Sequence, residues 1–528
     1  MPQSNPRKLF YYLLIVVSTT ISLARIASVE SRTAGPKKQH TPFLSANDRS
    51  RWCTTRALVD EGVYQIDSMI DGRDPNWKTI DLVRHRGADG KQHYYSSKPP
   101  LLPTLLAGEY WLLKKITGAS LADSPFYIGR IMLVLTNVVP LLLYFVFLAG
   151  LIEQQGRTDF GRIYVMSVAT FATLLTTFSV TINNHLVAAV SVLFATTAAI
   201  RIWYHNEKRL SFFILAGLAA GLATANELPA LSFLVLLGAG LFWKAPARTL
   251  FGYGLGVLLV ATAFFGTNYA AHRDLRPPYA HRHDGPVLLV AGTSLLDWIA
   301  GPGLPAGVRR EFLDAGHPLS DAVRLEERND RRGWKLVDPT YEQQYALLDK
   351  GPKTEVRSWD NWYEYDGSYW TETARQGVDR GEKSKWNYGF HVLLGHHGIF
   401  SLTPVWILSL VGLAMVVRDR GRGMPALAIL TLILTFVCLV FYIGLRPVAD
   451  RNYGGVNCGF RWMIWLTPLW VLGMIPILDW IAQYRGWRIV AFILLACSVF
   501  SSVYPGSNPW SHPWLYQYWK LLGWIGYS

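Results

Sequence analysis

Asp48 and Lys98 are two residues whose types suit group transfer at a phosphate. Asp48 stands in SANDRSRW, just after the first apolar run, and Lys98 stands in YYSSKPPLLP, just before another apolar stretch. A carboxylate within hydrogen-bond reach of a hydroxyl can act as a general base, and an ammonium is a point charge that suits phosphate. Each residue also has a structural alternative. Asp48 can cap a helix N-terminus, and Lys98 can extend toward lipid headgroups.

Asp60 and Glu61 compete with Asp48 for the role of base. The pattern of residues 45–67 predicts a helix that stops at Gly62, which places both carboxylates at its C-terminal end. The helix dipole disfavours negative charge there, so these carboxylates are either solvated or paired, Asp60 with an arginine one turn earlier. The catalytic carboxylate is therefore predicted among Asp48, Asp60 and Glu61, with Asp48 first.

Three arginines, Arg446, Arg451 and Arg461, gather around one loop near the C-terminal end of the sequence. If that loop faces outward, three arginines are unusual, because positive charge concentrates in cytoplasmic loops. Together with Lys98, such arginines suit an anionic ligand such as a phosphate. The structural alternative is an ion pair with Asp450.

Several further polar residues are candidates for substrate binding. They are Asn184, His185, Glu227, Asp274, His396 and His397. Glu227 stands between two apolar runs, where a carboxylate is either functional or a cap for the next helix. The histidines show no spacing that supplies a third metal ligand, so structural or hydrogen-bonding roles are favoured and no metal site is predicted. A divalent cation stays open as a cofactor.

The composition indicates that lipid is the main solvent of this chain. Of the 528 residues, 51% are hydrophobic and only 17% are charged, and there are 21 Trp. That balance is unlike a soluble enzyme and typical of a membrane protein with aromatic residues at both interfaces. The net charge of +14 is accordingly assigned to loops at the membrane rather than to a nucleic-acid surface.

About eleven segments are apolar and long enough to cross a membrane as helices, which takes ~20 residues. They are residues 9–27, 126–151, 163–182, 186–204, 210–225, 228–243, 249–269, 398–417, 424–445, 461–482 and 488–504. With the N-terminus in the cytoplasm, each short inner segment carries two or three basic residues, as the positive-inside rule requires. Alternatively, residues 9–27 are a signal peptide.

The predicted fold class is an all-α polytopic membrane protein, with residues 1–528 as one membrane domain. Two large outer segments interrupt the spans, residues 28–125 and 270–397. Residues 101–113 are too short to span and are predicted to form an interfacial helix entered through two prolines. Residues 286–300 are predicted to be interfacial or buried rather than spanning.

The order of these features resembles the GT-C superfamily of membrane glycosyltransferases. The resemblance is carried by an outward Asp in the first loop, by Lys-Pro-Pro-Leu, by GFHVLLGHHGIFSLTP (389–404) and by NYGGVNCGFRW (452–462). By pattern the chain is most similar to the protein O-mannosyltransferases and to the aminoarabinose transferases that modify lipid A. Many relatives place a second acid in the second outer loop, where this chain has Asn183, Asn184 and His185. A two-carboxylate mechanism is therefore in question.

The resemblance implies an inverting transferase in the inner cell membrane with its active site on the extracytoplasmic face. The donor would be a sugar on a polyisoprenyl phosphate, the acceptor a lipid, glycan or protein, and Asp48 the base. The phosphate of the donor would be bound by Lys98, Arg446, Arg451 and Arg461. Two other classes stay open. A glycan polymerase or ligase would use a lipid-pyrophosphate donor. A non-enzymatic transporter of lipid-linked glycans would need ionisable residues at mid-membrane and a repeat.

Overall fold

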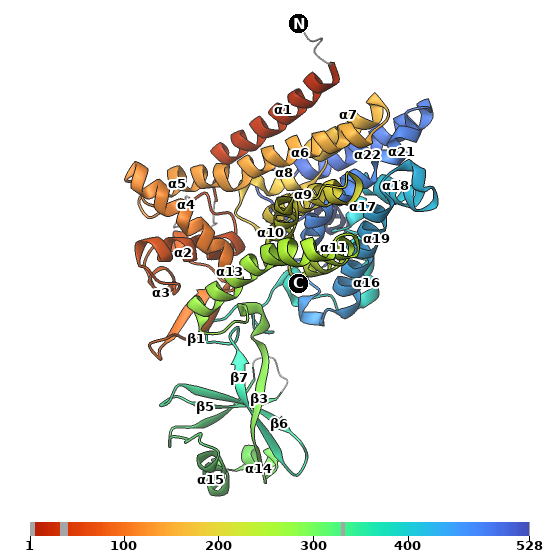
Figure 1. Cartoon of the computed structure of the whole chain (residues 1–528). Coiled ribbons are helices and arrows are strands. Elements are labelled where there is room, and N and C mark those ends of the chain that lie inside the picture. Colours follow the sequence, from red (N-terminus) through yellow and green to blue (C-terminus); the bar gives the residue numbers. More distant parts are fainter. Residues whose placement is uncertain (1–5, 32–40, 302, 329–332, 527–528) are drawn as a thin grey trace.

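The computed structural model describes residues 6–31, 41–301, 303–328 and 333–526. A bundle of helices forms one end of the molecule, a five-stranded sheet forms the other, and the elements of the first outer segment lie beside the bundle between them (Figure 1).

Seven helices of the described chain are long and apolar enough to cross a membrane, and a bent pair of helices makes a possible eighth. The seven are α1 (Pro6–Ser28), α5 to α6 (Pro125–Gln155), α7 to η3 (Asp159–Val180), α9 (Asn184–Tyr204), α12 to α13 (Pro246–His272), α19 to η9 (Pro425–Leu445) and α22 (Arg485–Val503). The bent pair joins η11 and α20 (Arg461–Gly473) to α21 (Ile475–Ile481) at 42°. The chain is therefore a multi-pass membrane protein.

The remaining three predicted spans are apolar helices of less than spanning length. They are α10 (Leu210–Asn226), η4 to α11 (Leu228–Lys244) and α18 (Trp406–Arg418). All eleven predicted segments are thus helical, but a count of eleven full spans is not confirmed. Residues 398–417 are broken after α17 (Ile399–Leu402) by Pro404, which has no N–H to continue a helix.

The first outer segment folds as α2 (Ala46–Asp60), α3 (Asp67–Ile70), a hairpin of β1 (Leu82–Arg86) and β2 (Gln92–Ser96), and α4 (Leu101–Thr117). Helix α2 ends where it was predicted to, because Gly62 has a φ of +74°. Its N-cap is Ser45, and Asp48 closes the capping box three residues later. Asp48 therefore serves the cap from inside the helix rather than as the N-cap itself. The predicted helix 101–113 is confirmed as α4, which packs Leu106 and Tyr110 against α2.

The second outer segment contains an antiparallel sheet, so the all-α class does not hold outside the membrane. Its strands are β3 (Arg282–Ala291), β4 (Arg324–Glu327), β5 (Trp334–Asp338), β6 (Gln343–Asp349) and β7 (Thr354–Asn361), in the order β3-β7-β6-β5-β4. Helices α14 (Leu295–Ala300) and α15 (Ala306–Asp314) cover one face, where Phe312 and Leu336 are buried. Residues 286–300 form β3 and α14, because short apolar runs fit strand and helix alike.

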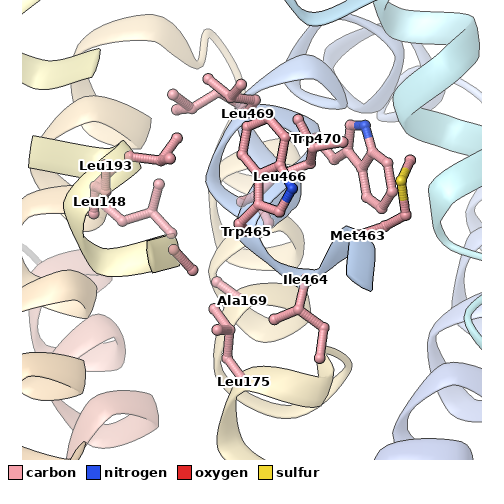
Figure 2. Close-up of a cluster of buried hydrophobic side chains, with 14 of the residues drawn as sticks. Leu148, Ala169, Leu175, Leu193, Met463, Ile464, Trp465, Leu466, Leu469 and Trp470 are labelled. Carbon is pink, nitrogen blue, oxygen red and sulfur yellow. The ribbon is translucent and has the colours of Figure 1, made fainter. Parts of the chain in front are cut away.

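The core of the bundle fixes the start of the bent helix pair. Trp465 is fully buried in a hydrophobic cluster that also contains Leu148, Ala169, Leu175 and Leu193, which come from four different helices (Figure 2). Deleting a large buried side chain of this kind costs about 3–5 kcal/mol. Since η11 is held at the centre of the bundle, the residue that begins it, Arg461, has a fixed position.

Candidate functional site

A cavity of about 410 Å³ lies where the first outer segment, the ends of several helices and the second outer segment meet. Its described lining contains six cations against two carboxylates. The cations are Arg51, Lys98, Arg282, Arg375, Arg446 and Arg461, and the carboxylates are Glu227 and Asp450. Aromatic rings complete the wall, including Tyr363, Trp370 and Trp462. A concave site with convergent cations of this kind attracts an anion.

Lys98 enters the cavity from the start of α4. Its Nζ lies 2.7 Å from Oδ2 of Asp81, and Ser97 Oγ donates to the other carboxylate oxygen at 2.7 Å. Burial lowers the pKa of Lys98 to about 8, although Asp81 opposes this shift. Burial alone would raise the pKa of Asp81, but the ammonium of Lys98 brings it below its usual range. The two prolines after Lys98 start α4, where proline is tolerated, and thereby hold the ammonium in place.

Arg51 joins the first outer segment to the helical bundle. Its Nη1 donates to the backbone oxygen and the Oδ1 of Asn47, one turn earlier on α2, and its Nη2 donates to Asn184 Oδ1 at 2.8 Å. Burial lowers the pKa of Arg51 to about 10, so the guanidinium stays charged at neutral pH. Asn184, a predicted substrate residue, thus lines the cavity as part of a fixed network.

Glu227, at the cavity wall, and His185, behind it, hold Arg461 in place. Glu227 Oε1 accepts from Asn184 Nδ2 at 2.7 Å and from His185 Nδ1, and His185 Nε2 accepts from Arg461 Nη1 at 2.7 Å. His185 and Glu227 are buried at 1% and 4% exposure. Because Arg461 can only donate, the imidazole carries its proton on Nδ1. This chain of contacts orients the guanidinium of Arg461 toward the cavity.

The loop from Arg446 to Arg461 contributes three arginines in two different roles. Arg446 lies over the ring of Trp462, with its Cζ 4.1 Å from the ring centroid, and lines the cavity. Arg451 donates instead to three backbone carbonyls, including that of Lys383 at 2.8 Å, and pins the loop from outside the cavity. Gly454 has a φ of +92°, and a Cβ there would lie 2.9 Å from Arg461 Nε, so the NYGG turn requires glycine.

Asp450 is the most accessible carboxylate of the cavity. Its side chain is 30% exposed, and its described ion pair is with Arg282, 3.3 Å from Oδ1 to Nη1. Arg282 lies over the ring of Tyr363, 3.9 Å from its centroid. A general base must come within hydrogen-bond reach of the hydroxyl that it deprotonates. Asp450 is the more exposed of the two cavity carboxylates, at 30% against 5% for Glu227, whose Oε1 is engaged by Asn184 and His185.

Asp48, the first sequence candidate for the base, lies behind the wall and outside the cavity lining. It is fully buried, and one oxygen accepts the backbone N–H groups of Ser45 (2.7 Å) and Arg49 (2.9 Å) and the hydroxyl of Ser45. The other accepts from the N–H of Leu44 and from Thr181 Oγ1 at 2.8 Å. This geometry favours the cap alternative, and the catalytic role of Asp48 stays a prediction.

The other two carboxylate candidates also lie outside the cavity lining. Asp60 pairs with Arg56 at 3.4 Å and with Lys114 at 2.7 Å, and Glu61 accepts from Ser68 Oγ at 2.7 Å. The first of these pairs is the alternative expected from the sequence. Both acids tie the end of α2 to its surroundings.

His396, His397 and Asp274 are not brought to the cavity. The two histidines are fully buried beside Tyr453, and burial lowers the pKa of His396 to about 2, so it is neutral. Asp274 pairs with Arg276 at 2.9 Å and lies on a different surface. Within the described ranges, no three His, Cys, Asp or Glu side chains are arranged to hold a metal ion.

Sequence reasoning missed three residues of the cavity lining, Arg51, Arg282 and Arg375, and Asp81, which pairs with Lys98. It named Asp450 only as an ion-pair partner of the three arginines. The spacing of Asn47 and Arg51, four residues apart, was a usable signal, because it puts both on one face of α2. Arg282 had no such signal, since it comes to the cavity through a strand that the sequence did not predict.

No protein-family model matches the sequence, and no curated protein matches it. Among solved structures, the protein O-mannosyltransferase Pmt1–Pmt2 complex of S. cerevisiae, bound to its sugar donor, is 12% identical, with a TM-score of 0.49 over 100% of this chain and 93% of that chain. The oligosaccharyltransferase AglB of Archaeoglobus fulgidus, with an inhibitory peptide and a dolichol-phosphate, is 12% identical, with a TM-score of 0.42 over 99% of this chain and 58% of that chain. Both belong to the superfamily that the sequence motifs resemble. Similarities of this size transfer no residue role and no activity.

Proposed function

We propose that this chain is a membrane glycosyltransferase that moves a sugar from a polyisoprenyl phosphate to an acceptor on the extracytoplasmic side. The observation that carries the proposal is the cavity at the ends of several helices, whose lining holds six cations against two carboxylates. An excess of buried positive charge is costly unless an anion compensates it. The phosphate of a lipid-linked donor supplies such an anion at the membrane surface.

Lys98, Arg446 and Arg461 are the proposed phosphate-binding residues. Each lines the cavity, and each is held by a neighbour, Lys98 by Asp81, Arg446 by Trp462 and Arg461 by His185. Donors that are already oriented before the reaction stabilise developing charge without reorganisation. Arg451 acts indirectly, because it positions the loop that carries Arg446.

The lipid part of the donor needs an apolar exit from the cavity. Leu228 and Phe441 line the cavity and are 50% and 38% exposed. They belong to η4 (Leu228–Ala230) and η9 (Val440–Leu445), which lie at the ends of apolar helices. An isoprenyl chain leaving the cavity between them enters the bilayer directly.

The reaction is a displacement at the anomeric carbon of the sugar. The acceptor hydroxyl forms the new bond to that carbon, the bond between the carbon and the phosphate oxygen breaks, and the configuration inverts. The hydroxyl proton passes to a carboxylate, and the leaving polyisoprenyl phosphate keeps the electron pair under the field of the cavity cations. Asp450 is the base that the geometry favours, and Asp48 is the base that the sequence favours.

A variant panel tests the function and separates the two carboxylates. Cells lacking the protein are complemented with wild type, Asp450→Asn or Asp48→Asn at matched membrane levels, and envelope glycans are compared by mass spectrometry. We expect one sugar mass, whose value reports a hexose or a pentose, to be missing in the deletion and with Asp450→Asn. Asp48→Asn should restore it in proportion to folded protein. A well-folded but inactive Asp48→Asn would make Asp48 the base. A deletion with an unchanged glycan profile would contradict the proposed function.

A further inference from the structure

A second concave surface, a cleft of about 650 Å³, lies on the sheet side of the molecule. It is bounded by the β1–β2 hairpin, by the residues that follow α13 and by the outer sheet. In Figure 1 the hairpin lies between the bundle and the sheet. The residues proposed for phosphate binding and for the base, Lys98, Arg446, Arg461 and Asp450, do not line this cleft.

The sheet turns its second face toward the cleft. Lys335 and Val337 on β5, Arg324 and Glu326 on β4, and Trp359 and Asn361 on β7 line it. Residues two apart in a strand share one face, and Val337 pairs with Gln344, which also lines the cleft. This face is opposite the apolar core under α14 and α15, where Leu336 packs. Tyr345 belongs to the core side and also reaches the cleft lining. A sheet face so rich in charged and amide groups beside a cleft is built for a polar ligand.

The charges of this face are largely matched within the protein. Lys335 is 8% exposed and lies 3.3 Å from Glu364 and 3.7 Å from Glu326. The whole described lining carries five cations and six carboxylates, so the cleft has no strong preference for an anion or a cation. Apolar lining is sparse, with Leu288 and Val337 as its aliphatic members apart from a proline. A lipid or an apolar peptide would need more apolar surface.

Two features in the cleft point to a ligand with many hydroxyl groups. The Oε1 of Gln344 and the Nε of Arg84 are buried without a hydrogen-bond partner, although buried polar atoms are normally satisfied. Trp359 is partly exposed, its N–H donates to Asn361 O at 3.1 Å, and the cations of Arg328 and Lys335 lie over its ring, 5.2 Å and 5.5 Å from the centroid. The part of the indole that stays exposed is an apolar surface surrounded by charged and polar groups, which matches the C–H face and the hydroxyl rim of a pyranose.

The cleft and the cavity share a wall of a few residues. Trp362 lines the cleft and Tyr363, the next residue, lines the cavity. Trp362 is clamped between His281 and His85, whose ring centroids lie 3.4 Å and 4.0 Å away, and its backbone bonds to β1 through Arg84. A chain molecule lying in the cleft can therefore bring its end over this wall to Arg282 and Asp450.

We propose that the cleft binds a saccharide chain and that this chain is the acceptor of the transfer. The acceptor role rests on the proposed function, whereas saccharide binding rests on the cleft alone. The amide group of Gln344 and the guanidinium of Arg84, which line the cleft, bind hydroxyl groups, and the exposed part of Trp359 contacts a sugar ring. The acceptor would then be a glycan rather than a protein or a simple lipid.

The test measures binding without any donor. The purified full-length protein in detergent is mixed with fluorescently labelled oligosaccharides released from the envelope of cells that lack the protein. Trp359→Ala and Gln344→Leu remove the proposed contacts, and Trp386→Ala is the matched control, since Trp386 is 89% exposed and lies outside the cleft. We expect wild type and Trp386→Ala to retain part of the pool and Trp359→Ala to bind it about tenfold more weakly, with Gln344→Leu also weakened.

Three outcomes would overturn the proposal. The first is that wild type retains no oligosaccharide, and the second is that both cleft variants retain as much as wild type. The third is that a peptide pool from the same envelope binds in a Trp359-dependent way while the oligosaccharides do not. Lys98→Met separates this proposal from the proposed function. This variant should lose transfer yet keep oligosaccharide binding. Retained transfer would contradict the proposed function but not the binding of saccharides in the cleft.

Discussion

The cavity and the cleft lie on the two sides of one short segment, yet their charges differ sharply. The described lining of the cavity has six cations and two carboxylates, and that of the cleft has five cations and six carboxylates. Both are polar, aromatic-lined hollows of several hundred cubic ångströms. The difference in net charge indicates that the cavity is built for an anion and the cleft for a neutral polar molecule. The proposed binding of the donor in the cavity and of the acceptor in the cleft rests on that contrast.

The largest effect is expected from removing one cation of the cavity, which tests whether the positive charge of the cavity is needed for transfer. Lys98→Met should lower transfer by about 100-fold or more, since removing one preorganised donor to a developing charge costs about 10²–10³ in rate. Rates are measured with membranes and a lipid-linked sugar donor. Lys114→Met is the matched control, because Lys114 also pairs with an aspartate at 2.7 Å but lies outside the cavity lining. Equal losses in both variants would contradict the role of the cavity.

The second largest effect concerns the carboxylate behind the cavity wall. Asp48→Asn should lower the free energy of unfolding by about 2 kcal/mol, because it weakens a capping box and buried hydrogen bonds, while leaving activity per folded molecule close to wild type. Thermal unfolding in detergent measures the first quantity and transfer per folded protein the second. An unchanged melting temperature with abolished transfer would instead restore Asp48 as the base.

The pH dependence of donor binding should follow the ammonium of Lys98. Its pKa is lowered to about 8, so above pH 8 the ammonium loses its proton and the cavity loses one positive charge. We expect the KM for the donor to rise up to about tenfold per pH unit above pH 8. Lys98→Arg should flatten the profile, since arginine stays charged. The same pKa shift affects folding in the opposite direction. Between pH 8 and about 10.5 the folded state binds fewer protons than the unfolded chain, so the free energy of unfolding rises with pH in that range.

The smallest expected effect is the response to salt. Raising NaCl from 50 to 500 mM should weaken donor binding a few-fold by screening, while saccharide binding in the cleft should change by less than about twofold. Titration calorimetry or fluorescence with each ligand measures both. Equal salt dependence at the two sites would mean that the difference in lining charge has no functional role.

The membrane part of the fold was predictable, and the outer part was not. The apolar runs located all eleven apolar helical segments, because length and hydropathy determine which residues enter lipid. Pro404 shows one limit of such patterns. It interrupts the apolar run, so that α18 is shorter than a full membrane span. Residues 286–300 show another, because their apolar run is read equally well as strand or helix, and the strand pairing that decides it is made with β7, more than sixty residues away.

The candidate site was half predictable for a related reason. Lys98, Arg446 and Arg461 were found because charge at an apolar boundary is conspicuous in a sequence. Asp450 was weighed only as their ion-pair partner, and the structure pairs it with Arg282 instead. Asp48 was predicted as the base because of its position after the first apolar run. A sequence does not show that both oxygens of a carboxylate are already engaged in hydrogen bonds within the protein. Convergence of distant segments, rather than residue type, decides which groups share a cavity.

The ion pair between Asp81 and Lys98 has a consequence for how the chain is made. These residues are close in sequence, whereas Arg461 is synthesised roughly 360 residues after Lys98. At ~5–20 residues per second, a nascent chain waits roughly 20–70 s before the last cation arrives. During that interval Asp81 already neutralises Lys98, so the growing protein never presents an uncompensated charge to the membrane at this place. The ion pair that helps to hold the finished site thus also neutralises Lys98 while the rest of the chain is being synthesised.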